Sequence, residues 1–175
     1  MSIGVNMKIL ALDQSTVSTG WAYFIDGELI RHGVIPVKNN DKIFPSWLLM
    51  LAGIKNMMCE LAVDSVVLED TIMQKSVTVL KELARLQGGI VGHCFANQIK
   101  TSYLYPTQWR KLIQLPQKKG MKRREIKELT MAYVKRTYQI APSEDECDAI
   151  CIGAAYNVAI NAQENKEKND RKDNY

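Results

Sequence analysis

The sequence lacks a long hydrophobic run, which limits the classes of protein that it can encode. No stretch of the 175 residues approaches the ~20 apolar residues needed to cross a bilayer. The nearest candidate, residues 43–54, is too short and contains Pro45 and Gly53. Near the N-terminus, Lys8 and Asp13 interrupt the apolar stretch that a signal peptide requires. We therefore expect a cytoplasmic protein that makes no contact with membranes.

Soft metal ligands are also scarce. The chain has four cysteines without Cys-x-x-Cys spacing and only two histidines, His32 and His93. A zinc site built on Cys147 and Cys151 would need further ligands that nothing in the sequence brings near. We expect buried, reduced thiols rather than disulfides or a zinc site.

Positive charge is abundant but concentrated. Between Arg110 and Lys127, eight basic residues are opposed only by Glu125, so this window carries a net charge of +7. The whole chain carries +4, which leaves −3 for the remainder. A solvated lysine-rich loop is one interpretation. The concentration in one window favours a polyanionic partner, with nucleic acid as the leading candidate.

Short apolar runs predict the strands. Residues 7–13 form a run suited to a strand buried on both faces, and it ends on Asp13. Asp26-Gly27 is a two-residue hairpin signal between residues 21–25 and 28–37, which predicts three antiparallel strands. Residues 66–69 predict a further buried strand that ends on Glu69.

Apolar residues at helical spacing predict the helices. The main ones cover residues 45–62, 75–98, 122–138 and 143–161, with a short strand at 102–105 and a short helix at 107–113. The helix over 75–98 has two apolar faces, which predicts packing on two sides. The order predicts one α/β domain, residues 1–162, with a mixed five-stranded sheet flanked by helices. Residues 163–175 are charged and lack an apolar anchor, which predicts a disordered tail.

A third acidic segment begins the last helix. Ser143 and Glu146 have the spacing of a capping box, which explains early acids without invoking function. It does not explain Asp148, which lies beyond the first turn and precedes an apolar run. Asp145 lies one turn before Asp148, so the two can face one point. Glu144 satisfies the same spacing, so the partner of Asp148 stays open.

Carboxylates from two strand ends and one helix face provide hard oxygen ligands. Mg²⁺ favours such ligands, and Mn²⁺ accepts the same ones. Two such ions about 4 Å apart activate water and stabilise the leaving oxygen of a phosphodiester. Together with the basic window, the acids favour a metal-dependent nuclease.

Three segments together resemble the RuvC-type Holliday junction resolvases, which are RNase H-like nucleases. They are LALDQSTVSTGWAYF, VVLEDTIMQKSVTVLKELARLQGGIV and DECDAICIGAAY. Each is weak alone, but their order and spacing make the resemblance specific over residues 8–161. It implies an RNase H-like fold.

The resemblance also implies a function. It implies a homodimer, joined through the helix over 75–98, that nicks opposed strands of a four-way DNA junction and leaves 5′-phosphate and 3′-hydroxyl ends. The implied catalytic ligands of two Mg²⁺ ions are Asp13, Glu69, Asp145 and Asp148. The implied contacts to DNA phosphates are Arg110, Lys111, Lys118, Lys119, Lys122 and Arg123.

The sequence departs from the family in two places. Gln14-Ser15 replaces the Pro-Gly common after the first aspartate. Ile72 stands where bacterial relatives carry an aromatic residue that wedges into the junction centre, and Met73 is an alternative apolar wedge or a core residue. The small size suits a bacteriophage member that acts in the host cytoplasm without branch-migration partners.

Three alternatives remain open. ALDQSTVSTGW also resembles the first phosphate loop of sugar kinases and actin-like ATPases, but those proteins need a second domain and a second phosphate loop. A non-catalytic junction binder of the same fold is disfavoured, because all four expected acids are present. A related nuclease acting on RNA–DNA hybrids or other branched DNA would share these residues.

Overall fold

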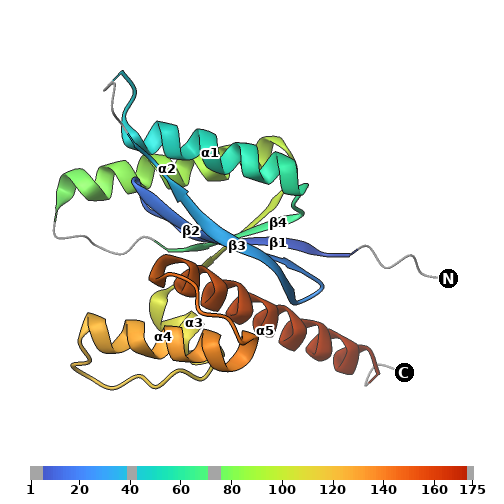
Figure 1. Cartoon of the computed structure of the whole chain (residues 1–175). Helices are drawn as coiled ribbons and strands as arrows, with labels where there is room; N and C mark the ends of the chain where they lie inside the picture. The colour runs from blue at the N-terminus through green and yellow to red at the C-terminus, as the bar shows by residue number, and fades with distance from the viewer. Residues whose placement is uncertain (1–5, 39–42, 71–75, 173–175) are drawn as a thin grey trace.

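A single five-stranded sheet separates two helical layers (Figure 1). The computed structural model describes residues 6–38, 43–70 and 76–172, except for the side chains of 167–169, 171 and 172. The strand order is β3-β2-β1-β4-β5. The predicted α/β class and mixed five-stranded sheet are therefore confirmed.

The first three strands form the antiparallel half of the sheet. They are β1 (Lys8–Asp13), β2 (Ser18–Ile25) and β3 (Glu28–Pro36). Asp26 and Gly27 both adopt positive φ, 51° and 87°, which is the conformation that a tight two-residue hairpin requires. The predicted hairpin and its position are confirmed.

The other two strands extend the sheet in parallel on the opposite side of β1. They are β4 (Ser65–Glu69) and β5 (Lys100–Leu104). Two helices cover one face of the sheet: α1 (Ser46–Leu61), which precedes β4, and α2 (Val77–Ala96), which connects β4 to β5 (Figure 1). They bury a core around Leu10, Ile54 and Ile90.

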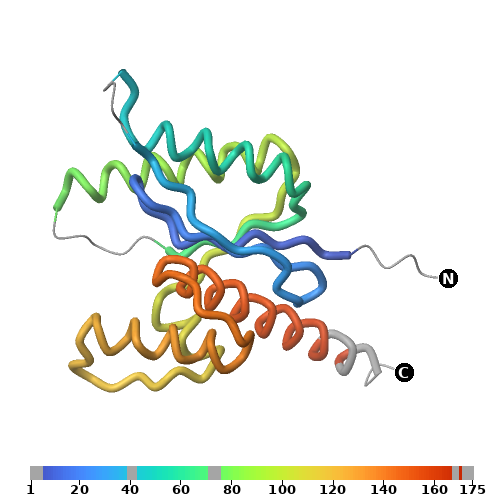
Figure 2. Tube along the Cα trace, in the orientation of Figure 1, coloured from blue at the N-terminus to red at the C-terminus, as the bar shows by residue number. Residues whose placement is uncertain are grey.

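The opposite face of the sheet is covered by the C-terminal part of the chain, which Figure 2 traces. Helix α5 (Glu144–Lys172) lies against β1 and β2, and α3 (Pro106–Leu112) and α4 (Arg123–Tyr138) pack on α5. Their core includes Phe24, Trp109 and Ile150, all almost fully buried. Both layers therefore hold the sheet rigidly, which matters because the candidate site is built at its edge.

Three sequence-based expectations differ from the structure. Helix α5 continues to Lys172, where the charged composition predicts a disordered tail from residue 163. Elongating a packed helix avoids the cost of nucleation, so residues such as Gln163 and Lys166 continue it while exposed. Within the single described chain, α2 buries one face, through Leu86, Ile90 and Cys94, so packing on a second side would need another chain.

The third difference concerns the thiols. All four cysteines are free, as predicted, but Cys59 is exposed while the other three are buried. Its position lies on the outer side of α1, where helical spacing alone left the direction of the side chain ambiguous.

Across the described residues, every helix is too short or too polar to traverse a bilayer.

Candidate active site

The four predicted acidic residues line one cleft of about 860 Å³. Asp13 ends β1, and Glu69 ends the neighbouring parallel strand β4. The preceding residues, Leu12 and Leu68, are paired in register, so the two carboxylates leave the sheet side by side. Asp145 and Asp148 come from the first turns of α5 and complete the acidic wall, in the order Asp13, Glu69, Asp145 and Asp148 along the chain.

A close backbone approach holds the start of α5 against β2. Gly20 pairs with Asp13 in the β1–β2 ladder. A Cβ atom added to Gly20 would lie 2.5 Å from the carbonyl carbon of Asp145, so only glycine permits this contact. The Ser18 hydroxyl donates a 2.7 Å hydrogen bond to Asp145 Oδ2. Strand β2 thus fixes both the backbone and the side chain of Asp145.

The concentration of negative charge perturbs the two strand-end acids. Burial raises the pKa of Asp13 to about 8, and the neighbouring Asp148 and Glu69 carboxylates contribute in the same direction. Burial also raises the pKa of Glu69, although a hydrogen bond from the Trp109 indole to Glu69 partly offsets the rise. Carboxyl groups with raised pKa values in a cleft are typical of functional sites.

Lys127 of α4 provides one positive charge inside this acidic cluster. Its Nζ lies 3.1 Å from Asp148 Oδ2, 3.4 Å from Glu144 Oε2 and 4.0 Å from Asp145 Oδ1. Burial disfavours the charged ammonium, but the attraction of Asp148 and Glu144 outweighs it and raises the pKa of Lys127. Lys127 is therefore a charged, largely buried partner of the α5 acids.

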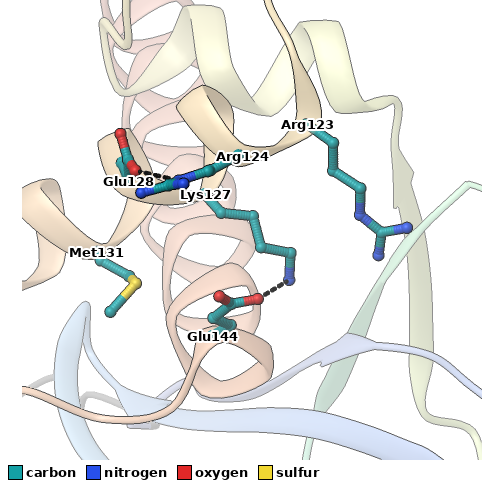
Figure 3. A pocket seen from close by; sticks show the side chains of 6 residues that line it. All are labelled: Arg123, Arg124, Lys127, Glu128, Met131 and Glu144. Atoms are coloured by element: carbon teal, nitrogen blue, oxygen red, sulfur yellow. Dashed lines mark hydrogen bonds and ion pairs between the residues drawn. The ribbon is translucent and has the colours of Figure 1, made fainter.

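Two separate pockets distinguish Glu144 from Asp145. Glu144 lines a neighbouring pocket of about 410 Å³ on α4, where its carboxylate receives the Lys127 ammonium (Figure 3). Asp145 lines the acidic cleft and adds to the negative charge around Asp13. This placement favours Asp145 over Glu144 as the cleft partner of Asp148, an alternative that spacing left open.

Glu146 has a structural environment. Its Oε2 accepts hydrogen bonds from the Ser143 backbone amide at 2.9 Å and the Ser143 hydroxyl at 2.6 Å. His32 Nδ1 lies 2.7 Å from Glu146 Oε1, which connects α5 to β3. These contacts lower the pKa of Glu146 against the opposing effect of burial. Glu146 closes the helix start, as the capping pattern predicts.

The predicted DNA-contacting residues divide into three groups. Arg110 and Arg123 line the acidic cleft, and in Figure 3 Arg123 points away from the Arg124–Glu128 ion pair. Four lysines are exposed and are not among the residues that line the cleft: Lys111, Lys118, Lys119 and Lys122. The proposed wedge residues Ile72 and Met73 lie outside the described residues.

The loop after Asp13 is bonded to itself. The Ser15 amide donates to Thr19 Oγ1 at 3.1 Å, and the Thr19 hydroxyl donates back to the Ser15 carbonyl at 2.8 Å. The Val17 amide donates to Ser15 Oγ at 3.3 Å. Two amides that a phosphate-binding loop would present to its ligand are thus engaged within the turn. This argues against the sugar-kinase interpretation and favours a turn that holds the Asp13 carboxylate.

Sequence reasoning missed three residues at this site: Ser18, Trp109 and Lys127. A signal existed for Lys127, because it shares a helical stripe with the fully buried Thr130 and Val134. A lysine on a buried stripe suggests an acidic partner. The contacts of Ser18 with Asp145 and of Trp109 with Glu69 span 127 and 40 residues, respectively, and no local pattern announces them.

The site suits a divalent cation by chemistry and charge. Four carboxylates supply hard oxygen donors, and burial together with the neighbouring carboxylates raises the pKa of Asp13. As placed, however, no three Asp, Glu, His or Cys side chains of the described residues converge on one point that could hold a metal ion. Binding would therefore require the carboxylates to turn toward a shared point and Lys127 to yield part of its contact with Asp148.

Comparisons with known proteins identify the fold. No protein-family model matches the sequence, and no curated protein is significantly similar to it. RuvC of T. thermophilus in complex with a Holliday junction substrate matches with a TM-score of 0.71 at 12% identity, covering 89% of this chain and 96% of that one. The yeast mitochondrial Holliday junction resolvase Ydc2 matches with 0.58 at 12% identity, covering 87% and 78%.

A viral protein gives a further match. The Fowlpox virus resolvase in complex with its substrate Holliday junction DNA matches with a TM-score of 0.54 at 15% identity, covering 88% of this chain and 99% of that one. At these identities the likeness shows the fold. The predicted resemblance to RuvC and other Holliday junction resolvases is therefore confirmed in three dimensions.

Proposed function

We propose that this protein is a metal-dependent endonuclease that cuts four-way DNA junctions. The observation that carries the proposal is the meeting of Asp13, Glu69, Asp145 and Asp148 in one cleft with Arg110 and Arg123. The fold adds support, because the matched RuvC and Fowlpox virus structures hold Holliday junction DNA. Carboxylates beside guanidinium groups suit a phosphodiester held at a cation site.

The proposed ligands of the metal are the four carboxylates, with Mg²⁺ as the expected ion, two per site, and Mn²⁺ as a substitute. Such ions, when bound, lower the pKa of water and neutralise charge on the leaving oxygen. The chain contributes position: Asp13 and Glu69 are fixed at adjacent strand ends, and Ser18 orients Asp145. Lys127, whose Nζ contacts Asp148, would give up part of that contact to the metal and leave its positive charge at the cleft.

The DNA would be held chiefly through its phosphates. Arg110 and Arg123 lie at the cleft and can bind the strand that is cut. The exposed lysines would contact the arms of the junction without reading sequence, and they are Lys111, Lys118, Lys119 and Lys122. Affinity carried by phosphates falls steeply with salt, so ionic strength must be held fixed in every comparison.

A cleavage assay tests the proposal. Labelled four-way junction is incubated with the protein and Mg²⁺ or Mn²⁺, and products are resolved beside markers with 5′-phosphate ends. We expect paired nicks from wild type and none from Asp13→Asn, Glu69→Gln or Asp148→Asn. Binding without nicks under any tested metal would make the protein a junction-binding module instead. Full cleavage by Asp148→Asn would refute the assignment of Asp148 as a catalytic residue.

Substrate breadth needs a separate competition. Linear duplex, forked DNA, an RNA–DNA hybrid and the four-way junction are offered together at one salt concentration. We expect the four-way junction to be cut first. Equal cleavage of the RNA–DNA hybrid would assign the chain to a different nuclease class of the same fold.

We also propose that the protein acts as a homodimer through α2. In support, the outer face of this helix is exposed in the described chain, including Val77 and Phe95. Added Cβ atoms at Gly88 and Gly92 on this face would meet nothing within 4 Å, so a second backbone has room to approach. Sedimentation at micromolar concentration should give the dimer mass, and Phe95→Asp should shift it toward the monomer. A monomer that cuts paired strands in concert would refute this arrangement.

A further inference from the structure

Trp109 is a buried residue with one polar edge directed at the candidate site. It lies on α3, is 1% exposed and is the largest fully buried side chain among the described residues. Its indole Nε1 donates a hydrogen bond of 2.7 Å to Glu69 Oε1. The indole nitrogen can only donate, so this hydrogen bond forms only when a carboxylate oxygen of Glu69 faces the indole N–H.

The fold fixes the position of this indole. Glu69 pairs with Leu104 in the β4–β5 ladder, and the chain turns directly from β5 into α3. The start of α3 is capped, because the Tyr105 amide donates to Gln108 Oε1 at 2.9 Å. Trp109 then returns over the end of β4 and packs into the core beneath α5. A donor placed on such a rigid base restricts the rotation of the carboxylate that it contacts.

The face of the same ring contacts the guanidinium group of Arg110, which also lines the cleft. The guanidinium carbon of Arg110 lies 4.9 Å from the centroid of the Trp109 ring, within the range of a cation–π contact. Arg110 Nε is buried and has no hydrogen-bond partner among the described residues. The ring therefore orients Arg110 while leaving this donor free for an oxygen ligand in the cleft that Arg110 lines.

We propose that Trp109 is a positioning residue that joins the two halves of the site: its N–H fixes Glu69 Oε1, and its ring face holds the Arg110 guanidinium. Glu69 Oε2 is then the oxygen left available to a cation, while Arg110 is held ready for a phosphate. The inference rests on the proposed function, since it gives Glu69 and Arg110 the roles assigned above.

The test separates the two contacts by substitution. Trp109→Phe keeps an aromatic face for Arg110 but removes the N–H, and Trp109→Leu removes both. We expect Trp109→Phe to weaken Mn²⁺ binding about tenfold in calorimetry, the range typical of groups that orient metal ligands. Its affinity for four-way junction DNA in a chelator should stay within about twofold of wild type. Trp109→Leu should lower both affinities.

Trp21→Phe is the matched control. Trp21 is also buried, at 7% exposure, but it belongs to the core on the α1–α2 side of the sheet. Trp21→Phe removes an indole that makes no hydrogen bond to Glu69, so the affinity of this variant for Mn²⁺ should remain that of wild type. An equal loss in Trp21→Phe and Trp109→Phe would reduce the effect to general destabilisation and overturn the proposal.

Nuclear magnetic resonance keeps the inference testable if Trp109→Phe does not fold. The chain has three tryptophans, whose indole N–H signals are assigned with Trp21→Phe and Trp47→Phe. In wild type, paramagnetic Mn²⁺ should broaden the Trp109 signal first, and Glu69→Gln should shift that signal more than the other two. Uniform broadening or an unmoved signal would overturn the proposal.

Failure of the proposed function gives a different result. If wild type binds no Mn²⁺, or Glu69→Gln binds it as tightly as wild type, the carboxylate site itself is wrong. If Glu69→Gln loses the ion but Trp109→Phe does not, only the positioning role of Trp109 is refuted.

Discussion

Replacing Gly20 with alanine should push the start of α5, which carries Asp145 and Asp148, away from strand β2. The new Cβ would lie 2.5 Å from the carbonyl carbon of Asp145, and ordinary contact begins near 3.4 Å. The obstacle is backbone on both sides, and the Asp145 carbonyl oxygen would lie closer still, so β2 and the start of α5 must move apart by about 1 Å or more. Overpacking of this kind costs about 1–3 kcal/mol in the free energy of unfolding.

The functional effect of Gly20→Ala should exceed its effect on stability. A displacement of about 1 Å at a reacting group lowers the rate roughly 100-fold. Asp145 would move with the α5 backbone and lose its 2.7 Å hydrogen bond from Ser18. We therefore expect single-turnover cleavage of a four-way junction, at saturating protein and fixed Mg²⁺, to fall about 100-fold.

A variant of similar stability controls for partial unfolding. Ile54 is fully buried in α1 on the other side of the sheet, and Ile54→Val should cost about 1 kcal/mol without moving the acids. Both variants are compared with wild type by urea unfolding and by cleavage below the unfolding transition. Gly20→Ala that cleaves at the rate of wild type, or Ile54→Val that cleaves as slowly as Gly20→Ala, would refute the reasoning.

Three further predictions address the electrostatics and supports of the site. The pKa of Asp13 is about 8 against an ordinary 3.8, so metal-free wild type should lose stability as the pH rises from about 4 to 8. Asp13→Asn should therefore melt above wild type by a margin that grows between pH 5 and pH 8, and a constant margin would contradict this. Ser18→Ala removes the hydrogen bond to Asp145 Oδ2 and should weaken Mn²⁺ binding about tenfold in calorimetry, with unchanged affinity as the contrary result. Glu146→Gln should lower the free energy of unfolding by about 1 kcal/mol in urea yet retain cleavage, because its contacts are with Ser143 and His32; loss of cleavage in a folded variant would place Glu146 in the site.

Much of the fold was predictable because its signals are local. The hairpin at Asp26-Gly27 depends on two residues that tolerate positive φ, and both adopt it. Continuous apolar runs predicted β1 and β4, since both strands are covered by helices on each face. The predicted end of α5 was wrong because local composition does not reveal that a packed helix can extend into exposed, polar sequence.

The candidate site was predictable only in part. Asp13 and Glu69 could be paired because adjacent parallel strands release their ends at one edge of a sheet. The choice between Glu144 and Asp145 could not be made, because both lie within a turn of Asp148 and differ only in the direction of the side chain. That direction depends on how α5 is rotated against β2, which the contact at Gly20 sets.

The sequence by itself determined the order of elements, the positions of the acids at strand and helix ends, and the concentration of basic charge before α4. These follow from hydrophobic period, turn chemistry and charge, which act over a few residues. Only the tertiary structure decided that Lys127 enters the acidic cluster, that Ser18 holds Asp145 and that Trp109 bonds Glu69. Those contacts join separate elements, so they depend on how the two helical layers pack against the sheet.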